Sequence, residues 1–416
     1  TTTMSSATTG GVWTSSNTGV ATISTGGVVT GVTAGTTTIT YTVTVGGCTN
    51  TATTTVTVNS LPTATIAAAS ATTFCDGGSV TLMGPSAPAG MTYTYVWNLN
   101  GTAITGATGN TYIAAASGSY TVTVTNNNGC SATSAATVVT ENPLPTVAAI
   151  TGTTAVCVGS GTTLANATTG GTWSSSNTAT ATVNASTGVV TGVNAGTVTI
   201  TYTVTNSNGC TNTSTATVTV NALPTPTITA SGATTFCSGS SVVLTASSAS
   251  TYQWNLNGTA IAGATSATYT ATAAGSYSVT VTNANGCTAT SGATSVTVNA
   301  LPTATVTAGG STTICAGGSV SLSANAGTGY TYQWSNGSAD QTISVSASGS
   351  YTVTVTDLNG CSTTSAATAV TVTPLPTVAS ITGNTGVCVG STTTMSSATT
   401  GGVWTSSNTG VATIST

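Results

Sequence analysis

The chain has 416 residues, with no Lys, Arg or His, four acidic residues and a net charge of −4. Without Lys or Arg it cannot neutralise phosphate groups, which excludes nucleic acid and anionic lipid surfaces as partners. Charged residues make up 1% of the chain and hydrophobic residues 39%, which is not the composition of a disordered protein. The sequence holds no apolar run of about 18 residues, so we expect no membrane insertion.

An exact internal repeat links the two ends of the sequence. Residues 1–25 recur letter for letter as residues 392–416, at an offset of 391. A match of this length indicates a tandem repeat. We therefore expect the partners of this chain to be neighbouring copies of the same repeat. One continuous polypeptide is the favoured arrangement, and separate subunits that complement each other are the alternative.

A Leu-Pro-Thr motif divides the repeat into modules. Proline cannot continue a central strand, so each motif predicts a rigid joint between domains. The motif begins at Leu61, Leu144, Leu223, Leu301 and Leu375. The predicted domains are 61–143, 144–222, 223–300 and 301–374, together with 1–60 as the C-terminal part of one module and 375–416 as the N-terminal part of the next.

Apolar residues alternate with threonine in segments such as Thr38–Val45 (TITYTVTV) and Tyr120–Thr125 (YTVTVT). Alternation with a period of two places Val, Ile and Tyr on the core face of a strand and Thr on the solvent face. Threonine is β-branched and favours strands while remaining polar. The sequence therefore predicts an all-β chain of tandem immunoglobulin-like (Ig-like) β-sandwiches in an elongated array.

Two kinds of module carry a family resemblance. The stretches Gly171–Val183 and Gly188–Thr203 resemble the bacterial group 2 Ig-like domains, and similar residues recur at Trp13–Ile23 and Gly27–Tyr41. The predicted domains 61–143, 223–300 and 301–374 resemble the Ig-like and PKD-like modules of large secreted surface proteins of the Bacteroidota. In 223–300 the pattern consists of Cys237, Val243, Leu244, Tyr252–Trp254, Gly275–Tyr277 and Asn285–Cys287. The resemblance implies an extracellular stalk, adhesin or fibre.

Each module has one tryptophan, at an equivalent position. A sugar-stacking surface is one interpretation, but a single Trp flanked by alternating residues is typical of the core of an Ig-like sandwich. We therefore predict core positions for Trp13, Trp97, Trp173, Trp254, Trp334 and Trp404.

The ten cysteines also come two per module, which indicates disulfides in an extracellular protein. We predict pairing within modules, because each module carries a complete pair. This gives Cys75–Cys130, Cys157–Cys210, Cys237–Cys287 and Cys315–Cys361, with Cys48 and Cys388 bonded to neighbouring copies. In an Ig-like topology, however, the two cysteines of a module lie at opposite ends. The alternative therefore joins successive modules through Cys75–Cys210, Cys157–Cys287 and Cys237–Cys361.

The sequence offers no catalytic or cofactor site. The acids Asp76, Glu141, Asp340 and Asp357 are far apart, and there is no His to pair with them or with a thiol. Zinc sites of the usual kind need a CxxC motif or His, and calcium sites need several acidic oxygens. We therefore predict no enzymatic activity, no metal and no cofactor.

Two functions remain. The favoured one is a structural repeat of a secreted filament or cell-surface stalk that gives reach, stiffness and protease resistance for adhesion or matrix formation. The alternative is an adhesin that binds glycans or another surface through exposed loops and aromatic side chains. Both are located outside the cell.

Overall fold

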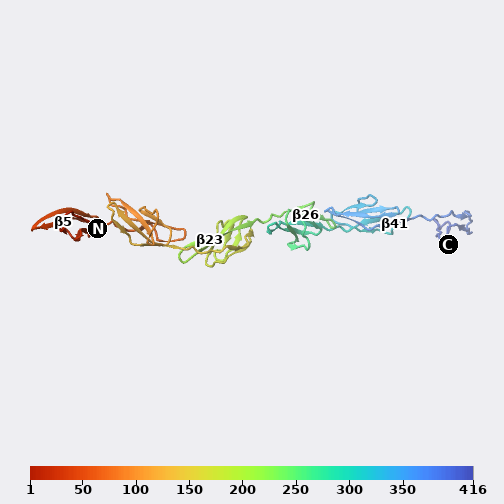
Figure 1. The fold of residues 1–416 in the computed structure, drawn as a ribbon. Helices are drawn as coiled ribbons and strands as arrows, with labels where there is room; N and C mark the ends of the chain where they lie inside the picture. The colour runs from red at the N-terminus through yellow and green to blue at the C-terminus, as the bar shows by residue number, and fades with distance from the viewer. Residues whose placement is uncertain (416) are drawn as a thin grey trace. The chain divides into compact units, whose positions relative to one another are not determined.

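The computed structural model describes residues 1–415 and consists of β-strands, turns and loops, with no helix in that range. The prediction of an all-β, Ig-like fold is confirmed (Figure 1). Since it contains no helix, the described part of the chain has none able to cross a membrane. The chain divides into two compact units, Thr1–Ala222 and Leu223–Thr416.

Residues 144–222 form a sandwich of two four-stranded sheets, ordered β16-β18-β21-β20 and β17-β23-β22-β19. The strands are β16 (Ile150–Gly152), β17 (Ala155–Cys157), β18 (Gly161–Asn166), β19 (Thr172–Ser175), β20 (Ala181–Val183), β21 (Val189–Gly192), β22 (Gly196–Thr205) and β23 (Thr211–Asn221). The inward-facing residues of both sheets form one core of eleven buried residues, which includes Leu164, Trp173 and Ile200. The second and last strands, β17 and β23, pair in parallel.

Residues 61–143 form a second sandwich in the first unit. Its sheets have the orders β12-β9-β7 and β11-β10-β13-β15-β8, with β14 paired to β13. The strands are β7 (Ala67–Ala68), β8 (Thr73–Cys75), β9 (Val80–Met83), β10 (Tyr93–Leu99), β11 (Thr102–Ala103), β12 (Thr111–Ala114), β13 (Gly118–Asn126), β14 (Ser131–Thr133) and β15 (Thr137–Asn142). Trp97 and Val122, which are opposite each other on β10 and β13, lie at the centre of the core.

Residues 223–300 repeat this arrangement in the second unit, with sheets β24-β26-β29 and β25-β32-β30-β27-β28, and with β31 paired to β30. The strands are β24 (Ile228–Ala230), β25 (Thr235–Cys237), β26 (Val242–Ala246), β27 (Thr251–Leu256), β28 (Thr259–Ala260), β29 (Thr268–Ala271), β30 (Gly275–Thr282), β31 (Thr288–Thr290) and β32 (Thr294–Asn299). Trp254 is at the centre of its core.

Residues 301–374 carry three three-stranded sheets around another core, ordered β33-β35-β37, β34-β41-β38 and β36-β39-β40. The strands are β33 (Val306–Ala308), β34 (Thr313–Cys315), β35 (Val320–Ala324), β36 (Thr331–Trp334), β37 (Thr342–Val345), β38 (Gly349–Tyr351), β39 (Val353–Thr356), β40 (Ser362–Thr364) and β41 (Thr368–Thr373).

The two end segments each hold part of a sandwich. Residues 1–60 form the sheets β1-β4-β3 and β2-β5-β6 around a core of four buried residues. Residues 375–415 form one two-stranded sheet, β42-β43. The strands are β1 (Thr2–Thr3), β2 (Val12–Ser15), β3 (Ala21–Ile23), β4 (Val28–Gly31), β5 (Gly35–Val45), β6 (Cys48–Val58), β42 (Thr382–Gly383) and β43 (Met395–Ser396).

Candidate functional site at the module joints

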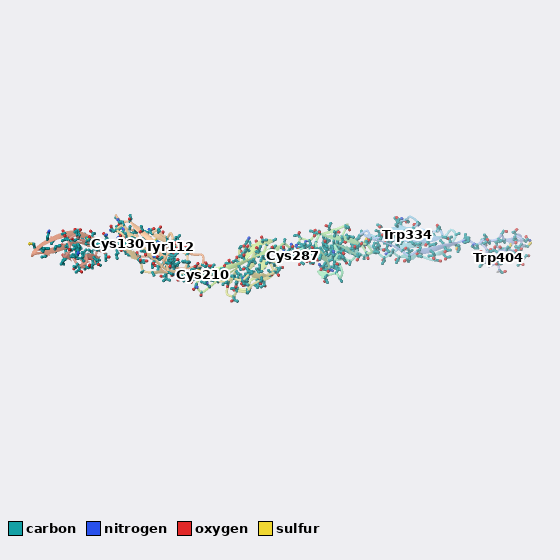
Figure 2. The ribbon with its side chains drawn as sticks, viewed as in Figure 1. Tyr112, Cys130, Cys210, Cys287, Trp334 and Trp404 are labelled. Atoms are coloured by element: carbon teal, nitrogen blue, oxygen red, sulfur yellow. A yellow bond between two sulfur atoms is a disulfide. The ribbon has the colours of Figure 1, made fainter. Side chains whose placement is uncertain are left out.

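The structure places the tryptophans of the four complete modules inside the sandwiches. Trp97, Trp173, Trp254 and Trp334 are buried, the last being labelled in Figure 2. The indole N–H groups of Trp97, Trp254 and Trp334 each donate to a backbone carbonyl at 2.8–2.9 Å. In the end segments, Trp13 and Trp404 are half-buried. Every Trp, Tyr and Phe side chain in residues 1–415 is buried or half-buried.

A tyrosine corner in three modules is a feature that the sequence analysis missed. The hydroxyls of Tyr120, Tyr277 and Tyr351 each donate to the carbonyl four residues upstream, at 2.9–3.0 Å. Such a corner at the start of a late strand is a hallmark of Ig-like sandwiches. The signal was present as an Ala-x-Gly-Ser-Tyr sequence in each of these modules. Burial raises the pKa of Tyr120 and of Tyr277 above the ordinary value.

The acidic side chains have local structural positions. Asp357 accepts hydrogen bonds from the backbone N–H groups of Asn359 and Cys361, and Asp340 accepts one from the hydroxyl of Ser338. Residues 1–415 contain no group of three or more His, Cys, Asp or Glu side chains that could hold a metal ion.

The predicted pairing of cysteines within modules is wrong. Cys75 bonds to Cys210 and Cys237 bonds to Cys361, so each bond joins two successive modules. The alternative pattern is confirmed at these two joints, and its Cys157–Cys287 bond stays a prediction. Cys48, Cys130, Cys315 and Cys388 are free.

The topology of each module explains why its two cysteines do not pair with each other. In 61–143, Cys75 ends β8 beside Asn142, the last residue of β15. Cys130 follows β13 and lies near Asn59, at the opposite end of the module. Strand β13 has nine residues and spans about 30 Å between these ends. Bridged cysteines need Cα atoms within about 7 Å, so Cys75 and Cys130 cannot meet.

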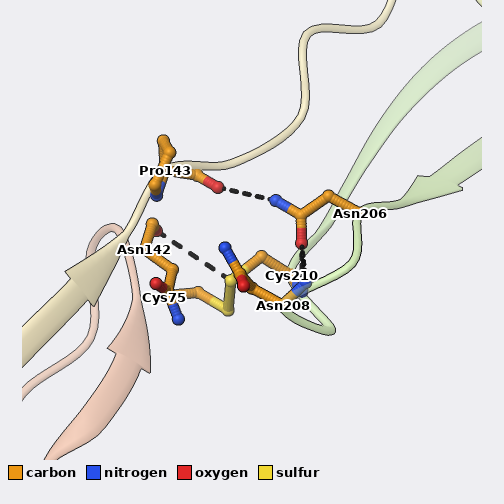
Figure 3. Close-up of a disulfide and its surroundings, with 6 residues drawn as sticks. All are labelled: Cys75, Asn142, Pro143, Asn206, Asn208 and Cys210. Atoms are coloured by element: carbon orange, nitrogen blue, oxygen red, sulfur yellow. Dashed lines mark hydrogen bonds between the residues drawn. A yellow bond between two sulfur atoms is a disulfide. The ribbon is translucent and has the colours of Figure 1, made fainter.

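The first joint brings the end of one module against a turn of the next (Figure 3). The Cα atoms of Cys75 and Cys210 are 5.5 Å apart. In the turn, the side-chain oxygen of Asn206 accepts from the backbone N–H groups of Asn208 and Cys210, both at 3.0 Å. The side-chain amide of Asn206 donates to the carbonyl of Pro143 at 2.9 Å. One asparagine therefore shapes the turn and holds it to the preceding module.

Further contacts close this joint. The amide of Asn212 donates to the carbonyl of Pro145 at 3.0 Å, and the sulfur of Cys210 lies 3.9 Å from the carbonyl of Asn142. Cys210 is 1% exposed. The disulfide is thus shielded on the side of the later module.

The joint between 223–300 and 301–374 has the same construction. Cys237 ends β25 beside Asn299, and its Cα lies 5.6 Å from that of Cys361. Asp357 takes the position of Asn206 and accepts the two equivalent backbone hydrogen bonds, at 2.8 and 2.9 Å. A carboxylate has no amide hydrogen, so Asp357 shapes the turn without donating to the preceding module.

The joints provide a covalent connection between folded bodies. The modules on either side of Cys75–Cys210 have separate cores, and the same holds for Cys237–Cys361. Each bond therefore constrains the orientation of two domains instead of completing one core.

A family model described as "Bacterial Ig-like domain (group 2)" matches residues 144–218. Among solved structures, a Ca²⁺-stabilised adhesin that helps an Antarctic bacterium reach out and bind ice is 16% identical; the match covers 76% of this chain and 100% of the adhesin chain, with a TM-score of 0.27. The ICAM-5 D1–D4 ectodomain fragment is 14% identical over 75% of this chain and 100% of its own, with a TM-score of 0.32. The immunoglobulin domains 1–5 of Sidekick-1 are 13% identical over 82% and 86%, with a TM-score of 0.19. No curated protein sequence matches the chain.

Proposed function

We propose that this chain is a structural repeat of an extracellular filament or cell-surface stalk, in which Ig-like modules stand in series and provide reach, stiffness and protease resistance for adhesion or matrix formation. The observation that carries the proposal is the disulfide between successive modules, at Cys75–Cys210 and Cys237–Cys361. A bond across a joint stiffens an array in a way that a bond inside one domain cannot.

The disulfides and the threonine-rich outer faces of the strands also support a structural role outside the cell. Disulfides form and persist in oxidising environments such as the cell exterior. Threonine covers the outer faces of long strands, as in β22, where exposed or half-exposed Thr alternates with buried Val, Ile and Tyr. This surface carries no cationic side chain and no trypsin site.

The burial of the aromatic side chains favours the structural role over glycan binding. Sugar recognition by stacking needs an exposed aromatic face, whereas Trp97, Trp254 and Trp334 are at most 2% exposed.

The test compares the oxidised chain with the chain after reduction, by small-angle X-ray scattering and circular dichroism. We expect reduction to broaden the distribution of molecular dimensions while the β-sheet signal is retained, because the joints loosen and the separate cores persist. The matched variant is Cys75→Ser/Cys210→Ser, which should produce part of the same change without reductant. Unchanged scattering in both experiments would contradict a stiffening role.

A further inference from the structure

The two cysteines of each joint disulfide differ in how well they are covered. Cys210 and Cys361, which belong to the later module of each pair, are 1% and 0% exposed. Cys75 and Cys237, which belong to the earlier module, are half-buried. The same difference occurs at both joints, so it follows from the way in which a joint is built.

Hydrogen bonds in the turn fix the later cysteine. The backbone N–H of Cys210 donates to the side-chain oxygen of Asn206, and the carbonyl of Cys210 accepts from the backbone N–H of Asn206, both at 3.0 Å. Cys361 makes the same two bonds with Asp357, at 2.8 and 2.9 Å. The sulfur of Cys210 also faces the carbonyl of Asn142 at 3.9 Å. An attacking molecule therefore reaches this sulfur only after the turn opens.

The earlier cysteine lies where a strand enters an exposed turn. Cys75 is the last residue of β8 and is followed by Asp76 and Gly77, which are both exposed. Cys237 ends β25 in the same way, before the exposed Ser238. This side of the bond is therefore the accessible one.

Access to each sulfur decides the course of thiol–disulfide exchange. A thiolate attacks one sulfur of a disulfide in line with the S–S bond, and the other sulfur leaves. Attack on Cys75 comes from the half-buried side, whereas attack on Cys210 requires an approach to a residue that is covered on all sides. The burial of the two cysteines therefore favours attack on Cys75 and release of Cys210.

We propose that each joint disulfide is a thiol-exchange site with a fixed polarity, in which a low-molecular-weight thiol adds to the cysteine of the earlier module and releases the cysteine of the later one. The modification sites are Cys75 and Cys237, and the released cysteines are Cys210 and Cys361. The released cysteine later displaces the small thiol and closes the bond again. The inference rests on the proposed function only in that the joint disulfides hold modules in series.

The exchange needs no further oxidant. The incoming thiolate forms a new S–S bond with Cys75, the Cys75–Cys210 bond breaks, and the sulfur of Cys210 leaves with the electron pair and takes up a proton. The small thiol is thereby oxidised and Cys210 is reduced. In the reverse step, the thiolate of Cys210 attacks the sulfur of Cys75 and expels the small thiolate.

Hydrogen bonds prepare the first joint for closure. The side-chain amides of Asn206 and Asn212 donate to the carbonyls of Pro143 and Pro145 at 2.9 and 3.0 Å. Neither contact involves a sulfur atom, so we expect both to hold Cys210 beside the preceding module while the bond is open. A tethered thiol attacks at a high effective concentration, so closure is fast.

The second joint replaces both of these donors. Asp357 takes the position of Asn206 and has no amide hydrogen. Thr363 takes the position of Asn212, and its buried hydroxyl has no hydrogen-bond partner within the described chain. We therefore expect the second joint to close more slowly, so that the small thiol remains bound there longer than at the first.

The test uses the full, oxidised chain after its free thiols have been blocked with N-ethylmaleimide. The chain is treated briefly with excess reduced glutathione, acidified, and labelled with deuterated N-ethylmaleimide before digestion with chymotrypsin. We expect mass spectrometry to find glutathione on Cys75 and Cys237 and the deuterated label on Cys210 and Cys361. Glutathione on Cys210 or Cys361 in equal or greater yield would overturn the proposal.

Two controls separate access from intrinsic reactivity. In urea, the preference for Cys75 over Cys210 should disappear, because the turn no longer covers Cys210. A preference that persists would show that the fold does not set the polarity. In native chains, Cys210→Ser leaves Cys75 free and Cys75→Ser leaves Cys210 free. N-ethylmaleimide should label Cys75 about tenfold faster or more, because labelling of Cys210 needs local opening. Equal labelling rates would contradict the polarity.

Exchange of residues between the two joints tests the closure step. After removal of glutathione, loss of the adduct should be slower at Cys237 than at Cys75. Asn212→Thr should slow the loss at Cys75, and Thr363→Asn should speed it at Cys237. Equal rates in all three chains would overturn the closure step. Failure of the exchange proposal would leave the stiffening by intact bonds untouched, because the scattering experiment measures that separately.

Discussion

The hydroxyl of a single tyrosine stabilises each tyrosine corner. Tyr277 is 1% exposed and donates to Ala273 at 2.9 Å. We expect Tyr277→Phe to lower the free energy of opening of β30 by about 0.5–1.5 kcal/mol, because the hydrogen bond to the carbonyl of Ala273 is lost. Hydrogen exchange of β30 peptides measures this. Tyr269→Phe is the control in the same module, since Tyr269 contributes ring contacts with Trp254 and Tyr277. Equal effects of the two variants would contradict the role of the corner hydroxyl.

The same buried phenols set the alkaline limit of stability. Burial raises the pKa of Tyr120 and of Tyr277, so the folded state favours the neutral side chain. Their contribution is complete below about pH 10, where tyrosine in the unfolded chain is also neutral, and is lost as the pH rises through the folded-state pKa. Urea unfolding followed by circular dichroism should show constant stability from pH 6 to 8 and a decline above pH 10. A decline below pH 8 would be unexpected, because the chain has no His.

The turn that presents Cys210 depends on Asn206. Asn206→Ala removes the acceptor of two backbone N–H groups and the donor to Pro143, whereas Asn206→Asp removes the donor only, as at Asp357. We expect reduction of Cys75–Cys210 by dithiothreitol to be slowest in the native chain, faster in Asn206→Asp and fastest in Asn206→Ala. A turn weakened by about 1–3 kcal/mol predicts a roughly tenfold effect or more for alanine. Thiol labelling and mass spectrometry give the rates. Equal rates would show that the turn does not protect the bond.

The strands could be predicted from the sequence because their alternation is local. Thr38–Val45 and Tyr120–Thr125 lie within β5 and β13. The cysteine pairing was harder, since it depends on which end of a sandwich each turn occupies. The parallel pairing of β8 with β15 places Cys75 at the far end of its module, and no local pattern encodes that contact. The tyrosine corner is local in sequence, and its Ala-x-Gly-Ser-Tyr signal was overlooked.

The absence of Lys and Arg along the entire chain predicts resistance to trypsin even after unfolding. The boiled and reduced chain should remain at full length on a gel after trypsin treatment.

Elastase, which cuts after small residues, tests the contribution of the fold to protease resistance. We expect the oxidised chain to survive longer than the reduced and alkylated chain, because cleavage needs local opening. If elastase degraded the oxidised chain and the reduced, alkylated chain at the same rate, the disulfides would not contribute to protease resistance.

The disulfide at the first joint also changes how the chain carries tension. The shortest covalent path from Leu61 to Ala222 follows residues 61–75, crosses to Cys210 and continues along β23. Cys75 and Cys210 are 135 residues apart in the sequence. While the bond is intact, unfolding cannot release the length of chain between them. At about 3.3–3.6 Å per residue, this hidden length is on the order of 450 Å. In single-molecule force spectroscopy, modules 61–143 and 144–222 should extend little while the bond is intact and should release that length after reduction. The thiol–disulfide balance of the surroundings then sets how far such a protein can be stretched.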